Sequence, residues 1–239
     1  IFISDAISFG NRMIVLNNII YYCEILNIKN IYLHSAYNWF IKNDIITDKV
    51  HISVIDKSQI NCFSKDTFCA GDGYSFFFPI NLKPERRLII LKEEIKNNLE
   101  KIEIDKEDLY IYIRSGDSFS KSGNEYTPAP YCFYKNILSN FNFKKIYLIS
   151  IDNSSPITNK LLKEYSFIIF KLNSLDKDLA LLCNAYNLVN SVSSFSQVAI
   201  ALNDNLINLF EYDVYKLGEK IYHLHYDIYK LEINFNIYR

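Results

Sequence analysis

Between residues 109 and 210, short apolar runs alternate regularly with segments whose apolar residues recur at a helical period. The apolar runs, such as Ile146–Ile149, are nearly continuous, which is typical of strands that helices cover on both faces. Alternation at this spacing predicts parallel β-α-β units with right-handed crossovers. We expect strands at 109–113, 146–151, 167–172, 188–192 and 206–210, and helices at 130–141, 155–165, 174–186 and from Phe195 onward.

The first half of the chain predicts a second set of such elements. A polar run at residues 101–108 separates the two sets and is typical of a linker. We therefore predict an α/β protein with two Rossmann-like, doubly wound lobes, residues 1–105 and 106–239, and a cleft between them. In the first lobe we expect strands at 1–4, 30–34 and 51–55, a helix at 11–27 with Met13, Leu16, Ile20 and Cys23 on one side, and a helix from Pro84 to about Glu100.

Composition excludes several classes of function. Of the 239 residues, 49% are hydrophobic and the net charge is −1, so neither a disordered chain nor a nucleic-acid binder is expected. No run of about 18 apolar residues is present, which predicts no membrane span. The five cysteines and four histidines lack ligand spacing, so we expect no metal site and interpret Cys23, Cys132 and Cys183 as buried thiols. The compartment stays open: cytoplasmic if the chain is complete, the secretory-pathway lumen if it is a trimmed domain.

Three polar sequences follow the predicted strands, at the ends where doubly wound sheets bind ligands. The first is Arg114-Ser115-Gly116-Asp117. An arginine at the end of a buried strand needs an anion or a carboxylate nearby, and its guanidinium can hold two phosphate oxygens at once. Gly116 permits a sharp turn, and Asp117 can orient the arginine. The structural alternative is an Arg–Asp pair that only closes the strand end.

The other two sequences come after the next strands. Asp152 follows a strand and precedes a capped helix, so it can accept hydrogen bonds from a base or a ribose, or simply start an Asx-turn. Ser193 and Ser194 lie between a strand and the helix that begins near Phe195. Hydroxyls and backbone N–H groups at a helix N-terminus bind anions, although an ordinary N-cap is the alternative. Together the three strand ends predict a site for a nucleoside diphosphate.

These motifs resemble those of the GT-B fucosyltransferases that form α1,2- and α1,6-linkages or modify protein hydroxyls. The segment 112–117 resembles their HxRxxD motif, with Tyr112 in place of the histidine. The strand that ends in Asp152 resembles their second motif, and residues 178–195, with an acidic helix start and a Ser-Ser turn, resemble the third. Near the N-terminus, Gly10-Asn11-Arg12 is similar to the turn that opens their first helix.

The resemblance implies a GT-B fold whose second lobe holds the donor GDP-fucose, which is a substrate and not a cofactor. It implies an inverting, metal-independent transfer of fucose to a glycan or protein acceptor. By position, Arg114 would grip the diphosphate and assist the departure of GDP, and Asp117 would support it. The residues that would bind the donor are Gly10, Asn11, Tyr112, Asp152, Ser193, Ser194 and Phe195.

Two alternatives stay open. Because Tyr112 replaces the histidine, the chain could be a GT-B transferase that uses another nucleotide sugar. Because no general base stands out, it could instead be a catalytically silent module that binds a nucleotide sugar or a glycan. Glu125 is a candidate base, but a solvated loop carboxylate is the competing interpretation.

Overall fold

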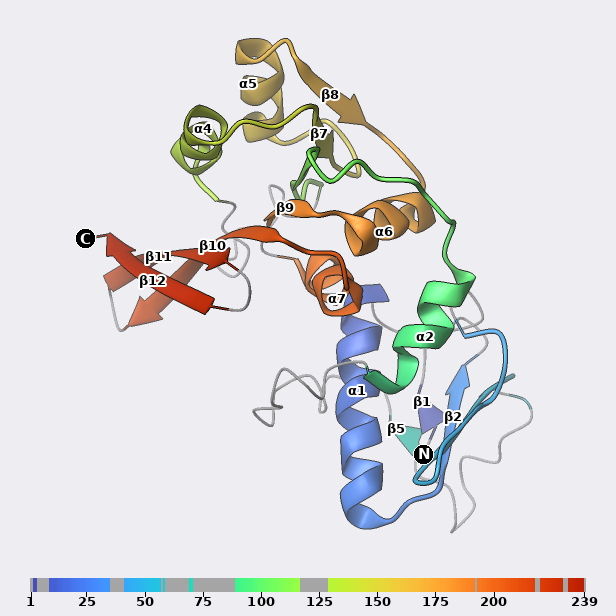
Figure 1. Cartoon of the computed structure of the whole chain (residues 1–239). Coiled ribbons are helices and arrows are strands. Elements are labelled where there is room, and N and C mark those ends of the chain that lie inside the picture. Colours follow the sequence, from blue (N-terminus) through green and yellow to red (C-terminus); the bar gives the residue numbers. More distant parts are fainter. Residues whose placement is uncertain are drawn as a thin grey trace. The chain divides into compact units, whose positions relative to one another are not determined.

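The computed structural model describes residues 2–3, 9–34, 41–56, 58, 69–70, 89–116, 129–191, 193–217, 220–229 and 232–238. The chain divides into two compact units, Ile1–Leu99 and Glu100–Arg239 (Figure 1). The predicted boundary, after residue 105, lies a little further along, inside the polar segment at residues 101–108.

The first unit is built on a five-stranded sheet in the order β3-β4-β2-β1-β5. Its pairs are parallel except for β3 and β4, which are antiparallel. The strands are β1 (Phe2–Ile3), β2 (Asn30–His34), β3 (Ile45–Ile46), β4 (His51–Ile55) and β5 (Cys69–Ala70), and the helices are α1 (Phe9–Leu26) and α2 (Ile89–Asn98).

The long helix α1 buries the side that the sequence pattern predicted. Met13, Leu16 and Cys23 are fully buried, and Ile20 is 5% exposed. The helix stops at Leu26 because Asn27 has φ 53°, the left-handed conformation that ends many helices, and the N–H of Ile28 donates to the Cys23 carbonyl at 2.9 Å.

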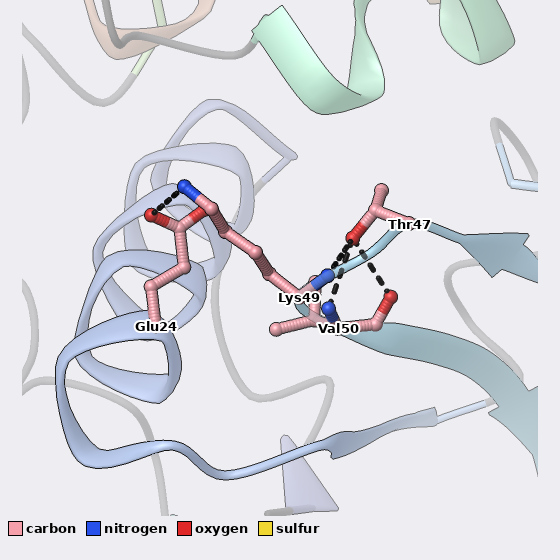
Figure 2. A network of polar contacts seen from close by, with 4 residues as sticks. All are labelled: Glu24, Thr47, Lys49 and Val50. Carbon is pink, nitrogen blue, oxygen red and sulfur yellow. Dashed lines mark hydrogen bonds and ion pairs between the residues drawn. The ribbon is translucent and has the colours of Figure 1, made fainter.

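Polar contacts fix the turn that precedes β4 (Figure 2). The Oγ1 of Thr47 accepts from the backbone N–H groups of Lys49 and Val50 at 3.2 and 2.9 Å, and it donates to the Val50 carbonyl at 3.0 Å. From the same turn, Lys49 Nζ reaches Glu24 Oε2 on α1 at 3.6 Å. The end of α1 is thereby tied to the β3–β4 hairpin.

The second unit contains a seven-stranded sheet in the order β12-β11-β10-β9-β6-β7-β8. Strands β10, β9, β6, β7 and β8 are mutually parallel, and each begins close to the first residue expected for it. The strands are β6 (Leu109–Tyr112), β7 (Ile146–Ile149), β8 (Ile168–Lys171), β9 (Asn187–Asn190), β10 (Asn208–Leu217), β11 (Lys220–Tyr229) and β12 (Glu232–Tyr238), and the helices are α4 (Tyr131–Asn140), α5 (Pro156–Glu164), α6 (Leu175–Asn184) and α7 (Ser194–Leu202).

The C-terminal strands add antiparallel pairs to the parallel strands that the sequence predicts. Strand β10 extends past residue 210, and β11 and β12 pair with it in antiparallel fashion. Their sequences mix Tyr, Asn, Lys and Glu with isolated apolar residues, without the continuous apolar run by which the parallel strands are recognised.

Helices cover both faces of the parallel strands. On one face, Leu109, Ile111 and Ile113 join a core that includes Phe133 of α4 and Leu161 of α5. Because side chains alternate along a strand, Tyr110 and Tyr112 lie on the opposite face. There, the ring of Tyr112 contacts Phe195 of α7 with centroids 5.6 Å apart, and α6 packs beside α7. This is the doubly wound arrangement that the near-continuous apolar strands predicted.

Candidate functional site

The strand order of the second unit reverses between β6 and β9. The chain proceeds outward from β6 through β7 to β8, and then returns to place β9 on the other side of β6. Helix α4 follows β6, and helix α7 follows β9. The two helices lie on opposite faces of the sheet (Figure 1). In doubly wound sheets, ligands bind at the carboxyl ends of the strands beside such a reversal. Arg114 follows β6 there, and Ser191 and Ser193 follow β9.

The turn after β6 is attached to both neighbouring strands. The N–H of Ile113 donates to the Ile149 carbonyl of β7 at 3.0 Å. One residue later, the N–H of Arg114 donates to Ser191 Oγ, after β9, at 3.3 Å. The Arg114 side chain is partly buried. The main chain of Arg114 therefore lies at the reversal point, where the sequence predicted an anion-binding group.

Asp152, after β7, lies against the same turn. Its Oδ1 accepts from the N–H and the hydroxyl of Ser154 at 2.8 and 2.6 Å. These bonds, the hydroxyl first, hold the pKa of the Asp152 carboxyl below its ordinary value. The contact with the Ser154 N–H makes an Asx-turn, the structural alternative that the sequence left open. A direct contact between Asp152 and the donor stays a prediction.

Gly116 completes this turn in a conformation that favours glycine. Its φ is 65°, its N–H donates to Ser154 Oγ at 3.0 Å, and a Cβ at this position would lie 3.3 Å from Asp152 Oδ2. A glycine at this position therefore lets the turn close against the Asp152 carboxylate without strain.

We expect Gly116→Ala to lower the free energy of unfolding by about 1–2 kcal/mol, because a left-handed conformation is strained for an L-residue. Denaturant-induced unfolding measures the loss. Asn27→Gly is the matched control, since Asn27 is an exposed residue with φ 53°, and relief of strain there should slightly raise the free energy of unfolding. An unchanged midpoint for Gly116→Ala would show that the turn does not require glycine.

The start of α7 is capped by Ser193. Its Oγ accepts from the Phe195 N–H at 3.2 Å, and its carbonyl accepts from the Gln197 N–H at 3.1 Å. Ser193 is 7% exposed, whereas Ser194 is partly buried. The N-cap alternative is thus observed, and anion binding at this helix start stays a prediction. Because the Phe195 amide is bonded internally, a phosphate would meet the Ser193 hydroxyl proton and the positive end of the helix dipole first.

Two residues of this edge carried no assigned role in the sequence. Ser191 gives no motif signal, and only the structure reveals its bond to Arg114. Asp178 lies in the first turn of α6, which follows β8 at the same carboxyl edge. It is 4% exposed and accepts from Asn173 Nδ2 at 2.8 Å, and burial raises the pKa of its carboxyl to about 6. A buried carboxyl with a raised pKa is a functional-site candidate, and the acidic helix start was its only sequence signal.

The remaining predicted residues do not belong to the described part of the second unit. Gly10 and Asn11 belong to the first unit, where they lie within the first turn of α1 and not ahead of it. Asp117 and Glu125 lie outside the described residues. In the described part of the chain, no three His, Cys, Asp or Glu side chains are grouped as metal ligands would be. Likewise, none of the helices in the described ranges is long and apolar enough to span a bilayer.

The interpretation of three cysteines as buried thiols needs one correction. Cys23 and Cys183 are buried, and burial raises the pKa of the Cys23 thiol. Cys132 is exposed, because it lies on the outward side of α4, next to the side that buries Phe133, Tyr134 and Ile137.

No protein-family model matches the sequence, and no curated protein matches it. Among solved structures, the fucosyltransferase NodZ from Bradyrhizobium is similar to this chain, with 11% sequence identity and a TM-score of 0.50. The alignment covers 94% of this chain and 98% of the NodZ chain. A structure of the NodZ α-1,6-fucosyltransferase co-crystallised with GDP matches 89% of this chain and 94% of its own, with 11% identity and a TM-score of 0.48. The chain therefore has the α/β fold of NodZ, and the predicted GT-B-like fold is confirmed.

Proposed function

We propose that this chain is an inverting glycosyltransferase that transfers fucose from GDP-fucose to a glycan or protein hydroxyl. One observation carries the proposal: the turn of Arg114 and the capped start of α7 meet at the reversal point of the sheet, linked through Ser191. A fixed cation beside a helix N-terminus is suited to a diphosphate. The resemblance of the motifs to those of fucosyltransferases, and the fold shared with one of them, support fucose as the sugar.

In the proposed reaction, the acceptor oxygen attacks the anomeric carbon as the bond to the β-phosphate oxygen breaks. GDP leaves with the bonding electron pair, and the acceptor proton passes to a base or to solvent. Negative charge develops on the diphosphate, and the Arg114 guanidinium and the N-terminus of α7 stabilise it. Asp117 supports the arginine, and Asp152 holds the turn that carries it. Tyr112, Ser193, Ser194 and Phe195 contact the donor, and the motif resemblance assigns the same role to Gly10 and Asn11.

The second candidate is a transferase that uses another nucleotide sugar. The specific observation is that Tyr112 is only 9% exposed and packs its ring on Phe195. A buried tyrosine in that position offers a phenol where the fucosyltransferase motif has an imidazole. Recognition of the base can therefore differ from that of the GDP-fucose enzymes.

Nucleotide release from a panel of donors separates the two candidates. The chain is incubated with GDP-fucose, GDP-mannose and UDP-sugars, with water or mixed glycans and glycoproteins as acceptors. We expect GDP to be released from GDP-fucose in preference to the other donors, and a chelator of divalent metals to leave the rate unchanged, because fixed protein charge stabilises the leaving group. Preferential release from a UDP-sugar would favour the second candidate, and release from no donor would contradict both.

A further inference from the structure

Buried serine hydroxyls surround the turn that carries Arg114. Ser150 is fully buried, and Ser115 and Ser191 are 2% and 3% exposed. They belong to the segments that follow β7, β6 and β9, the three central strands at this edge. Hydroxyls at such depth require hydrogen-bond partners, and each of these serines has them on the turn or at its borders.

On the β7 side the hydroxyls form a chain. Ser150 Oγ lies 2.8 Å from the Ile113 carbonyl and 3.0 Å from Ser115 Oγ. Because a hydroxyl has one proton, Ser150 donates to the carbonyl and receives the proton of Ser115. Ser115 Oγ then accepts from the Asp152 N–H at 3.3 Å. This chain fixes the residues on both sides of Arg114 to the end of β7.

On the β9 side, Ser191 holds Arg114 itself. Its Oγ accepts from the Arg114 N–H at 3.3 Å, and its carbonyl accepts from Ser196 Oγ of α7 at 3.2 Å. Ser196 is fully buried and also donates toward the Ser193 carbonyl at 3.0 Å. The arginine main chain is therefore connected through Ser191 to the first turn of α7, the other half of the proposed diphosphate site.

We propose that Ser150 and Ser191 are positioning residues that set the direction in which Arg114 leaves the sheet. After the Ile113 N–H bond to β7, serine hydroxyls bond to the turn from both sides: Ser150 Oγ to the Ile113 carbonyl and Ser191 Oγ to the Arg114 N–H. A serine side chain has one torsion to its oxygen, so it holds the main chain more rigidly than a long polar side chain would. The inference rests on the proposed function, because the group that is positioned is the proposed diphosphate ligand.

Comparing GDP with guanosine isolates this role, since the two ligands differ only in the diphosphate. Dissociation constants are measured by ligand-observed NMR for the wild type, Ser150→Ala, Ser191→Ala and Arg114→Ala. We expect the two serine variants to bind GDP about tenfold more weakly, the loss that follows from one disturbed hydrogen bond to a charged ligand. Guanosine binding should be unchanged, because it does not use Arg114.

Ser155→Ala is the matched control. Ser155 is fully buried and caps α5 by accepting from the Thr158 N–H at 3.3 Å, so its loss should lower the unfolding midpoint without changing either affinity. If an alanine variant does not fold, Ser191→Cys keeps the size of the side chain with a poorer hydrogen-bonding atom and serves in its place.

The outcomes distinguish a failure of the positioning role from a failure of the proposed function. If Arg114→Ala weakens GDP but not guanosine, while both serine variants bind the two ligands as the wild type does, the positioning role is wrong and the function stands. Equal weakening of both ligands by the serine variants would show a merely structural role and also overturn it. If the wild type binds no GDP, the proposed function fails and the positioning role fails with it.

Discussion

Arg114→Ala should reduce nucleotide release from GDP-fucose by about a hundredfold or more, the effect of removing one preorganised donor from a developing anion. Arg114 follows β6 at the reversal point, and its main chain is held by the sheet, so the fold should survive the loss of the side chain. The rate is measured at saturating donor, and circular dichroism verifies the fold. Arg114→Lys should restore little, because an ammonium cannot make the two-pronged contact with phosphate oxygens.

Lys145→Ala provides the matched control for charge. Lys145 is exposed and precedes β7, so it lies at the opposite edge of the sheet from Arg114. Its removal lowers the net charge by the same amount and should leave the rate unchanged. Activity retained by Arg114→Ala, or lost equally in Lys145→Ala, would contradict the assignment of Arg114 to the diphosphate.

Asp178→Asn should raise the free energy of unfolding by about 2 kcal/mol at pH 8. Each unit by which the pKa of Asp178 is raised corresponds to about 1.4 kcal/mol, and solvent screening reduces the total. Burial raises the pKa of Asp178 to about 6 in the folded chain, above its ordinary value of 3.8. The folded state therefore holds the proton more tightly than the unfolded state. Protonated Asp178 therefore contributes favourably to the free energy of unfolding below about pH 4, and this contribution is lost as the pH rises through 6.

The amide of asparagine has nearly the same shape as the acid and can still accept from Asn173. The two proteins should therefore unfold at the same midpoint near pH 4, and the variant should be the more stable above pH 6. Thermal unfolding at several pH values measures the difference.

Asp105→Asn is a control of opposite sign. Lys144 Nζ lies 2.6 Å from Asp105 Oδ2 and, with the Glu107 N–H, lowers the pKa of this exposed carboxyl. Its stabilising contribution is present above its ordinary pKa and is lost as the pH falls, so the asparagine variant should be slightly less stable at neutral pH. A stability gain for Asp178→Asn that is the same at pH 4 and pH 8 would contradict a buried, ionised Asp178.

The parallel strands of the second unit could be predicted because both of their faces are covered. Burial on two sides demands the unbroken apolar runs of β6 and β7, which no surface element needs. Two helix N-termini could also be predicted, at Ser155-Pro156 and at Ser174, since capping depends on residues adjacent in the sequence. Strands β11 and β12 were not predicted. In antiparallel strands apolar residues alternate with polar ones, as in Glu232–Tyr238, and do not form the unbroken runs by which the parallel strands were identified.

The strand ends that carry the candidate residues could be predicted, but the hydrogen bonds at these strand ends could not. The rule that ligands bind at carboxyl strand ends needs only the order of elements, and it selected the segments of Arg114, Asp152 and Ser193. The partner of each short polar side chain depends instead on loop geometry within a few tenths of an ångström. For that reason the sequence could offer the Asx-turn of Asp152 only as an alternative, and it gave no sign of the bond from Arg114 to Ser191.

Calorimetric titration with GDP and with UDP, in the absence of divalent metal, tests the central claim most directly. The claim is that the carboxyl edge of β6, β7 and β9 binds the diphosphate of a guanine nucleotide through Arg114 and the start of α7. We predict saturable binding of GDP, and binding of UDP that is at least about tenfold weaker, a difference of about 1.4 kcal/mol. Equal or tighter binding of UDP, or no binding of either nucleotide, would contradict it.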